Sequence, residues 1–387
     1  MKILCISHEY PPIGGGGATA CKNIASEYVR AGNEVIVLTA AFQGRPNIEE
    51  SNGVKIIRVP CKRKAADHSS FAEMFSFLVS AYCRLPKIVE DENVNICQVF
   101  FGIPSGPLGL YLLRRYNIPF IIRLGGGDVP GGQKRYQGIY TLIGPILKKI
   151  WKNAAFVVSN SEGLLEHARR FSCDATFRII PNGINPTDFS EKSERKKSEI
   201  FRICSVARIL ERKGLQHMVQ ALPALKKKIN GRIKYTIIGD GPYRNQLETM
   251  AKELQVTDEI EITGFLERRE VLNRLSNYDV FVCPSYREGM PNVVLEAMAS
   301  GLPIVMTACE GSKELIDGNG FIIPLDSNIS QEIEKAIIQL ERNDELRHKM
   351  GRQSVNKVLS EFTWERTAAS YLELFETVLK PTCTAEV

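Results

Sequence analysis

Short apolar runs that alternate with helix-like segments constrain the fold of this chain more than any other feature of its sequence. The first run covers residues 3–7; a Pro- and Gly-rich loop, a helical pattern over 18–31 and a second run at 35–38 follow it. Strands that are apolar on both faces are typical of a parallel sheet with helices on both sides. The strand–helix–strand order therefore predicts an α/β fold with a doubly wound parallel sheet.

The same alternation begins again in the second half of the chain. Further strands are expected at 202–207, 234–239, 260–263, 280–284 and 304–307. A densely charged stretch over 190–200 indicates a linker, and a chain of 387 residues has the length of two domains. We predict Rossmann-like domains over 1–189 and 190–362, followed by an amphipathic helix over 363–380.

Charge is distributed unevenly between the two halves. The net charge is +6, and the surplus of Lys and Arg lies in residues 1–189. Its basic clusters are at 62–64, 114–115, 134–135 and 148–149. Such clusters suit an anionic partner, for example a membrane surface, or they form an ordinary solvated surface. No recognised nucleic-acid-binding motif accompanies them, so we expect no nucleic-acid partner.

The ten cysteines give no sign of a metal site or a disulfide framework. They form no Cys-x-x-Cys pair and no Cys/His spacing suited to zinc, and free thiols in a reducing cytosol explain them best. The chain starts without a secretory signal pattern, and no apolar segment reaches about 18 residues. We therefore expect a cytoplasmic protein without a membrane-spanning helix.

The loop after the first strand contains four consecutive glycines at 14–17. Open α/β sheets bind ligands at the carboxyl ends of their strands, and glycine lets backbone N–H groups approach a ligand phosphate. Gly15 and Gly16 are therefore candidate phosphate contacts. The spacing does not match the dinucleotide pattern G-x-G-x-x-G. A purely structural turn is the alternative.

Two cations follow the first strand of the second half. Arg208 and Lys213 lie between an apolar run and a helical pattern, and two positive charges at the carboxyl end of a strand suit a diphosphate. An exposed pair near a helix start is the alternative. Gly239 and Gly241 occupy the turn after the next strand. That turn either shapes a wall for a nucleobase or is a tight connection.

The strongest signal lies over 284–298, where a strand ends and a helix begins near Pro291. The first amide groups of that helix are suited to hold an anion. Glu288 precedes the helix and Glu296 lies within it among apolar residues. Sugar hydroxyls are good partners for such carboxylates, because one carboxylate accepts two hydrogen bonds from neighbouring hydroxyls. A core ion pair is the alternative for Glu296.

The spacing of Glu288 and Glu296 resembles the E-x(7)-E motif of the retaining family-4 glycosyltransferases, which have the GT-B fold. Other segments resemble the same family in the same order. They are Gly15 and Gly16, Pro181 to Gly183 with Phe189, Arg208, Lys213 and Gly214, Gly239 to Gly241, Gly264, Asp279, residues 296–303 and Asn319 to Phe321. The resemblance implies two Rossmann-like domains that face each other across a cleft, and a last helix that packs back on the first domain.

The resemblance also implies roles for individual positions. Arg208 and Lys213 would neutralise the diphosphate of a nucleotide-sugar donor and support its departure. Glu296 would accept hydrogen bonds from the ribose, and Glu288 from the transferred sugar. The other implied substrate contacts are Gly15, Gly16, Asn182, Gly239, Gly241, Gly289, Met290, Asn292 and Val293. The family retains anomeric configuration without a divalent metal, and the lack of an Asp-x-Asp pair agrees with that.

One departure from the family concerns a histidine that many relatives carry in a first-domain loop facing the sugar. The corresponding region, 123–131, contains no histidine. Asp128 within it, and His8 after the first strand, are the candidates for that place. The alternatives are a turn or helix-cap carboxylate for Asp128 and a satisfied loop histidine for His8.

Residues 71–83 are rich in apolar and aromatic side chains. They are predicted to form either a core helix or a ledge for a lipid-linked acceptor at a membrane surface.

These features together predict a glycosyltransferase that moves a hexose-like sugar, with retention, from a nucleotide-diphosphate sugar to an acceptor. A glycan or lipid-linked intermediate of bacterial lipopolysaccharide or capsule synthesis is the expected acceptor, and the inner face of the cell membrane the expected place. No cofactor is expected besides the donor. A nucleotide-sugar epimerase and a non-catalytic sugar-nucleotide-binding subunit are the alternatives.

Overall fold

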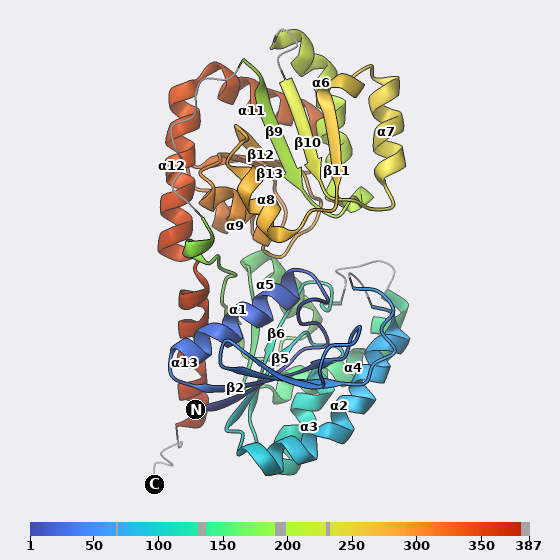
Figure 1. Ribbon diagram of the computed structural model, residues 1–387, viewed down its shortest axis with the longest axis vertical. Helices are drawn as coiled ribbons and strands as arrows, with labels where there is room; N and C mark the ends of the chain where they lie inside the picture. The colour runs from blue at the N-terminus through green and yellow to red at the C-terminus, as the bar shows by residue number, and fades with distance from the viewer. Residues whose placement is uncertain (67–68, 131–136, 190–198, 230–232, 381–387) are drawn as a thin grey trace. The chain divides into compact units, whose positions relative to one another are not determined.

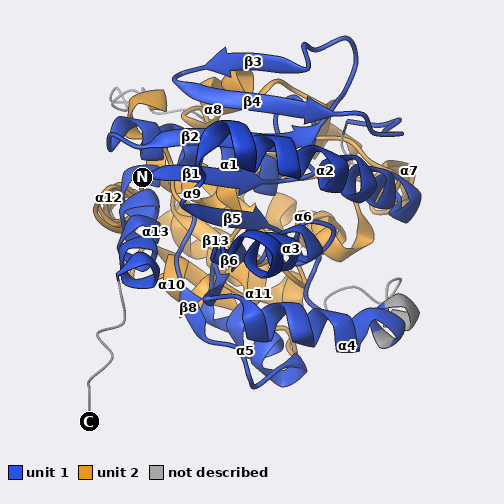
Figure 2. Cartoon of the chain, turned by 90° about the horizontal axis from the view of Figure 1, so that it is seen from below, with its two compact units in different colours: residues 1–182, 364–387 blue, residues 183–363 orange. Residues whose placement is uncertain are grey.

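The computed structural model describes residues 1–66, 69–130, 137–189, 199–229 and 233–380. The chain forms two compact units (Figures 1 and 2). The first unit contains residues 1–182 and 364–387, and the second contains residues 183–363. The division therefore falls at 182/183, ahead of the expected boundary at 189/190.

Residues 183–189 belong to the second unit because their contacts lie there. The N–H of Ile184 donates to the carbonyl of Phe362 at 2.8 Å, and Ile184 also pairs with Thr363 in an isolated parallel bridge. Asp188, in the 3₁₀ turn Pro186–Asp188, accepts a hydrogen bond from Arg268 at 2.8 Å. Charge density alone does not predict such contacts, which explains the difference. Residues 190–198 of the expected linker lie outside the described part of the chain.

The first unit is built on an eight-stranded sheet in the order β3-β4-β2-β1-β5-β6-β7-β8. Its strands are β1 (Lys2–Ile6), β2 (Glu34–Ala40), β3 (Ile48–Ser51), β4 (Val54–Val59), β5 (Ile96–Phe100), β6 (Phe120–Arg123), β7 (Phe156–Ser159) and β8 (Phe177–Ile179). Neighbouring strands pair in parallel, except that β3 is antiparallel to β4. Its helices are α1 (Gly16–Arg30), α2 (Phe71–Glu92), α3 (Gly106–Tyr116), α4 (Gln137–Asn153), α5 (Glu162–Phe171) and α13 (Trp364–Leu379).

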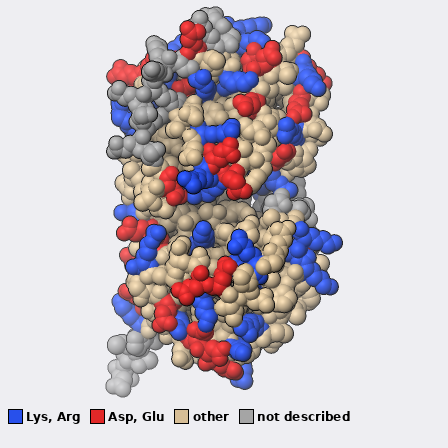
Figure 3. All heavy atoms as spheres, in the orientation of Figure 1, with Lys and Arg blue, Asp and Glu red and all other residues tan. Residues whose placement is uncertain are grey.

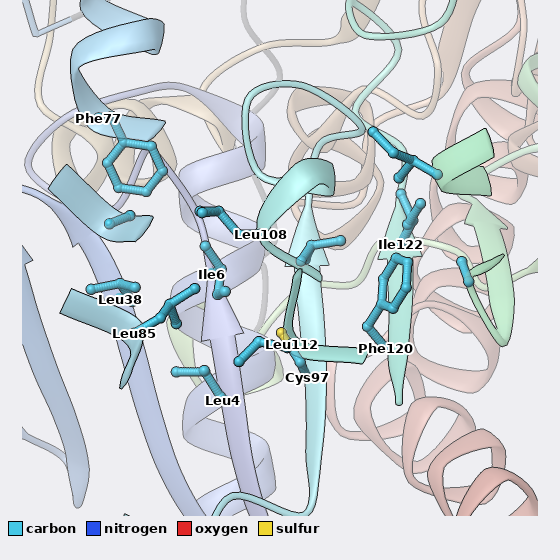
Figure 4. Close-up of a cluster of buried hydrophobic side chains, with 14 of the residues drawn as sticks. Leu4, Ile6, Leu38, Phe77, Leu85, Cys97, Leu108, Leu112, Phe120 and Ile122 are labelled. Carbon is cyan, nitrogen blue, oxygen red and sulfur yellow. The ribbon is translucent and has the colours of Figure 1, made fainter. Parts of the chain in front are cut away.

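Successive residues of a strand point to opposite faces of the sheet. Since the central strands are apolar on both faces, helices cover both. In β1, Leu4 and Ile6 pack with α2, α3, α4 and α5 in one apolar cluster, part of which Figure 4 shows. Ile3 and Cys5 pack with α1 and α13 in a second cluster. The last helix thus completes the core of the first unit, and the ring centroids of its Phe375 and of Tyr28 in α1 lie 5.5 Å apart.

The second unit is built on a six-stranded parallel sheet in the order β11-β10-β9-β12-β13-β14. Its strands are β9 (Phe201–Val206), β10 (Ile233–Ile238), β11 (Ile260–Gly264), β12 (Val280–Cys283), β13 (Ile304–Thr307) and β14 (Gly320–Ile323). Its helices are α6 (Leu215–Lys228), α7 (Arg244–Glu253), α8 (Arg268–Leu275), α9 (Asn292–Ala299), α10 (Ser312–Leu315), α11 (Ile329–Arg342) and α12 (Asp344–Glu361). One face packs against α6, α7 and α11, and the other against α8, α9 and α12.

The two Rossmann-like sheets confirm the predicted α/β class. The pattern of apolar runs in the sequence does not indicate β3 or β14. β3 is the antiparallel edge strand of the first sheet, and β14 is an edge strand of the second. β3 has the sequence Ile-Glu-Glu-Ser and is largely exposed, so it carries no apolar alternation. Among the helices that the structure describes, none combines the length and apolar content that crossing a membrane requires.

Candidate functional site

An ion pair joins the loops that follow β9 and β12, which are neighbours in the second sheet. Lys213 Nζ pairs with Glu288 Oε1, and Ser285 Oγ donates to the same carboxylate oxygen at 2.8 Å. Both ionic side chains are largely but not fully buried. The structure therefore brings together one of the two predicted cations and the first acid of the E-x(7)-E motif.

Three glycines allow the loops that follow β9, β10 and β12 to pack closely. A Cβ at Gly214 would lie 1.9 Å from the carbonyl oxygen of Pro284, and one at Gly239 would lie 2.0 Å from that of Ala207. A Cβ at Gly241 would lie 2.3 Å from the carbonyl oxygen of Ile209. For Gly239 and Gly241 these contacts match the tight connection, the second of the two readings open from the sequence.

A small cavity of about 10 Å³ lies beside the ion pair. It is lined by Ser205, Val206, Ala207, Lys213, Leu215, Phe281, Val282, Cys283, Pro284, Ser285, Glu288 and Val293. Of the predicted contacts it includes Lys213, Glu288 and Val293, whereas Arg208 and Glu296 do not line it. The pocket therefore gathers part of the predicted set.

Arg208 is exposed within the loop that follows β9. Backbone hydrogen bonds hold the loop on either side of it, from Ala207 N to Ile238 O at 3.1 Å and from Ile209 N to Asp240 O at 2.8 Å. The backbone of Arg208 is thereby fixed, while its side chain faces solvent.

The loop between β13 and α10 supports the loop that carries Glu288. Glu310 Oε2 accepts a hydrogen bond from the backbone N–H of Glu288 at 3.1 Å. A Cβ at Gly311 would lie 2.3 Å from the carbonyl oxygen of Gly289, so the two loops touch through their backbones. The adjacent Met290 is buried. Glu310 was not among the sequence candidates, and only its place after a strand could have suggested it.

Helix α9 begins directly after Pro291, with Asn292 and Val293 as its first residues. Pro291, which precedes the helix, provides no side-chain cap, and no acidic residue lies in the first turn. The polarity of this helix start favours an anion. Farther along the helix, Glu296 is buried. Its Oε1 accepts a hydrogen bond from Arg268 Nε at 2.9 Å, so Glu296 does belong to an ion pair.

Burial raises the pKa of Glu296, and the adjacent Arg268 guanidinium acts in the opposite direction. Arg268 also donates from Nη1 to Asp188 Oδ2 at 2.8 Å. Arg268 and Asp188 are functional candidates that sequence reasoning missed, because their meeting depends on contacts between distant segments.

Gly15 and Gly16 lie at the start of α1 in the first unit. Both are exposed, and a Cβ at Gly15 would meet no atom within 4 Å. The first turn of α1 has no capping side chain and no acidic residue. The polarity of such a helix start favours a ligand anion.

His8, just after β1, is buried and neutral. Its ring lies edge-on to Phe101 at a centroid distance of 4.9 Å, and its Nε2 is 3.7 Å from Glu9 Oε1. Burial, with a smaller contribution from Arg63, lowers the pKa of His8 to about 3. Its Nδ1 is buried without a hydrogen-bond partner among the described residues.

Asp128 holds two backbone loops of the first unit together. Its Oδ2 accepts a hydrogen bond from Gly102 N at 2.6 Å, and its Oδ1 accepts one from Gly125 N at 2.8 Å. Burial raises the pKa of Asp128, and these amide donors oppose the rise. The geometry fits the turn carboxylate that the sequence left open as its alternative role.

Asn182 is buried at the end of the first unit, where Arg123 at the end of β6 donates to its Oδ1. This contact fixes the end of the segment 1–182 to the sheet of the first unit. The structure gives Asn182 a partner within the first unit, and its proposed contact with substrate stays a prediction.

Comparison with known families assigns both halves of the chain. The family described as Glycosyltransferase Family 4 matches residues 14–188, and that described as Glycosyl transferases group 1 matches residues 186–357. An uncharacterized glycosyltransferase of Methanocaldococcus jannaschii is 26% identical over 334 residues, which is 82% of this chain and 83% of the relative. The putative colanic acid biosynthesis glycosyltransferase WcaL of Escherichia coli is 35% identical over 150 residues, 37% of each chain.

Solved structures agree with this assignment at the level of the fold. Sucrose-phosphate synthase from Thermosynechococcus elongatus has a TM-score of 0.83 at 21% identity, covering 98% of this chain and 99% of that one. HepE of Anabaena, solved in complex with UDP-glucose, has a TM-score of 0.75 at 16% identity, covering 97% and 100%. Since the two family matches are consecutive along the chain and both units have Rossmann-like sheets, this chain belongs to the family-4 glycosyltransferases of the GT-B fold.

Proposed function

We propose that this glycosyltransferase moves a hexose-type sugar, with retention of anomeric configuration, from a nucleoside diphosphate sugar to a glycan or lipid-linked acceptor. The Lys213–Glu288 pair carries the proposal, because it places a cation and a carboxylate from two neighbouring strand ends beside one pocket. A diphosphate needs the first of these groups, and the hydroxyls of a sugar need the second.

Without a ligand, the two groups neutralise each other. When the donor binds, its diphosphate would take Glu288's place beside Lys213, and Glu288 would accept hydrogen bonds from sugar hydroxyls. Ser285 Oγ donates to the same carboxylate oxygen at 2.8 Å, so Glu288 keeps a partner during this exchange. The exposed Arg208 would add the second positive charge to the diphosphate. We propose that these two cations do the work that a metal ion does in other transferases.

The N-terminus of helix α9 would hold the remaining phosphate oxygens. We assign the first amides of α9, at Asn292 and Val293, to the diphosphate. Contact of the donor with Gly15 and Gly16 stays a prediction from the sequence. Glu296 would receive the ribose hydroxyls through its Oε2, since Oε1 already accepts from Arg268. The relative HepE supports a uridine diphosphate donor as the first candidate, because it was solved with UDP-glucose.

The chemical step needs no strong base from the protein. The bond between the anomeric carbon and the leaving phosphate oxygen breaks as the acceptor oxygen bonds to the same face of that carbon. The acceptor proton passes to the leaving phosphate oxygen. Lys213 and Arg208 would stabilise the charge that develops on the diphosphate. His8 and Asp128 would have structural roles and support the loops near the sugar and the acceptor. Burial keeps His8 neutral, and two backbone amides already bind Asp128.

A lipid-linked acceptor at an anionic membrane surface is the acceptor that the first unit favours. Residues 71–83 belong to helix α2, in which Phe77 is buried in the core, whereas Phe75, Val79 and Tyr82 are exposed. The exposed residues follow helical spacing and form one stripe. Leu142 and Ile146 of α4 are exposed as well, with the exposed basic cluster at 148–149 next to them. On the face that Figure 3 shows, basic and acidic side chains are interspersed over both units.

The relative WcaL supports an acceptor from surface polysaccharide synthesis, since its name assigns it to colanic acid biosynthesis. Liposome flotation tests the membrane contact. We expect binding to anionic vesicles and its loss on Phe75→Ser with Val79→Ser. Equal recovery of the variant and the wild type with anionic vesicles would remove the membrane from the proposal.

A donor screen tests the proposed activity. The full chain is melted in the presence of UDP-, GDP-, ADP- and TDP-sugars, and the stabilising donor is then incubated with and without a lipid-linked acceptor in EDTA. We expect acceptor-dependent release of the nucleoside diphosphate and an unchanged anomeric configuration by NMR. Epimerised donor without acceptor would identify an epimerase, and binding without turnover a non-catalytic subunit. An inverted product would refute retention.

A further inference from the structure

A row of three charged side chains ends at Glu296 in the second unit. Glu296 Oε1 accepts from Arg268 Nε at 2.9 Å, and Arg268 Nη1 donates to Asp188 Oδ2 at 2.8 Å. Arg268 is the first residue of α8, and Asp188 is the last residue of the 3₁₀ turn Pro186–Asp188. The row therefore connects α9 with the turn at the start of the second unit.

The geometry of this row fixes Arg268 at both ends. Two different nitrogens of one planar guanidinium bind two different carboxylates, which sets the direction of the group as well as its position. The other oxygen of Asp188, Oδ1, lies 3.4 Å from Asn185 Nδ2 within the same turn. On Glu296 only Oε1 is engaged, and Oε2 accepts no hydrogen bond from the described residues. One oxygen thus remains for a ligand.

We propose that Arg268, held by Asp188, is a positioning residue that keeps Glu296 ionised and oriented for the ribose hydroxyls of the donor. The inference rests on the proposed function, in which Glu296 receives the ribose. A buried carboxylate without a cation takes up a proton, and the protonated acid no longer accepts two hydrogen bonds from a diol. The turn at 186–188 thereby supports the donor site without touching the donor.

Arg268 is the positive charge that compensates the negative charge of the buried Glu296. Strands β12 and β13, which pack beside α9, contain no charged residue. The buried residues of α12, which also packs against α9, are uncharged: Met350, Gly351, Ser354 and Val358. Asp188 is the other charged neighbour and, being an anion, adds to the rise in the pKa of Glu296 that burial causes. Loss of Arg268 should therefore raise this pKa further, and ribonucleotide binding should then weaken at a higher pH than in the wild type.

Calorimetric titration of the full chain with UDP, GDP and ADP, and with the 2′,3′-dideoxy form of the tightest binder, tests the inference. We expect the wild type to prefer the ribonucleotide by roughly 10- to 100-fold, as loss of hydrogen bonds to a charged group implies. Arg268→Gln should abolish this preference and move the pH midpoint of binding upward. Asp188→Asn should reduce the preference less, and Arg268→Lys should restore part of it.

Arg274→Gln is the matched control, because Arg274 lies on the same helix and forms an exposed ion pair with Glu270 at 2.7 Å. It should leave the ribose preference unchanged. If the wild type binds none of the three nucleoside diphosphates, the proposed function fails and this inference fails with it. If the wild type prefers ribose and Arg268→Gln keeps both that preference and the pH midpoint, only the positioning role is wrong. If Arg268→Gln loses affinity equally for the ribonucleotide and for its 2′,3′-dideoxy form and has a lower Tm, the role of Arg268 is merely structural and the inference is overturned.

Discussion

The strand ends of the two sheets differ in how their charges are satisfied. In the first unit, Asp128 is bound by backbone amides and His8 is neutral. In the second unit, the charges form side-chain pairs between separate loops, such as Lys213 with Glu288 and Arg268 with Glu296. Asp128 thus holds the backbone of the first unit, whereas these four charges of the second unit hold one another.

This difference assigns a structural role to Asp128 in the first unit and a binding role to the ion pairs of the second. A carboxylate that accepts from backbone amides cannot leave them without exposing unpaired buried N–H groups, which costs about 1–3 kcal/mol for each group. A side-chain ion pair beside a pocket can exchange one partner for a ligand charge of the same sign, so that the remaining charge is not left buried without a partner. The donor is therefore expected at the second unit, and the following changes test that division.

Lys213→Ala should have the largest effect. Loss of a cation that stabilises the leaving diphosphate is expected to lower kcat by up to about 10³-fold, or about 4 kcal/mol. Steady-state kinetics with saturating donor measures this change. Lys228→Ala is the control, because Lys228 is the last residue of α6 and pairs with Glu334 of α11. Neither residue lines the pocket, so kcat should stay unchanged. Undiminished turnover of Lys213→Ala would contradict the assignment of the donor site.

Asp128→Ala should act on stability first. It removes two hydrogen bonds to a charged group and leaves two N–H donors without their partner, at an expected cost of about 3 kcal/mol in the free energy of unfolding. Urea denaturation measures this cost, with the exposed Asp174→Ala as control. Turnover of the folded variant decides its chemical role: an unchanged kcat removes Asp128 from the mechanism. Full stability of the variant would show that the hydrogen bonds of Asp128 do not stabilise the first unit.

His8 should make the first unit sensitive to acid. Its folded pKa of about 3 lies below the ordinary value of 6.5, so the unfolded chain takes up a proton below pH 6.5 while the folded chain does not. Stability is therefore lost as the pH falls through 6.5, by about 2 kcal/mol at pH 5. His8→Phe should flatten the stability profile between pH 7.5 and pH 5. The same slope in both proteins would assign the acid sensitivity to other groups.

Glu310→Ala should have the smallest effect of the four. Loss of its hydrogen bond to the backbone of Glu288 loosens the sugar-binding loop, and kcat/KM is expected to fall by about tenfold. Affinity for the bare nucleoside diphosphate should change little, since that ligand lacks the sugar. Glu310→Gln keeps an acceptor oxygen and should retain most activity, as should the exposed Glu345→Ala on α12. An equal loss of affinity for UDP and for UDP-sugar would show that Glu310 acts on the whole pocket.

The fold was largely predictable because its signal is local. Buried parallel strands such as β1 and β12 are short apolar runs, and glycines or prolines mark their ends, so both sheets could be located from the sequence. β3 was missed because an exposed edge strand has no apolar face. The domain boundary was misplaced by several residues because the bridge between Ile184 and Thr363 joins segments far apart in the chain.

The candidate site was predictable in its residue types and less so in its pairings. Glu288 and Lys213 could be singled out as charges that follow buried strands, and the resemblance to family-4 glycosyltransferases gave them roles. No spacing rule links Lys213 to Glu288 or Glu296 to Arg268, because these pairs join different loops. The supporting residues Asp188 and Glu310 were missed for the same reason.

The sequence by itself determined the two α/β units, the family and the positions at which chemistry follows a strand, because strand periodicity and turn residues act over a few neighbouring positions. Only the tertiary structure decided that Asp128 is engaged by two backbone amides and that Glu296 shares its charge with Arg268. Burial and partner choice depend on which loops the folded sheets bring side by side. The free energy of a charge depends on those neighbours more than on its place in the chain.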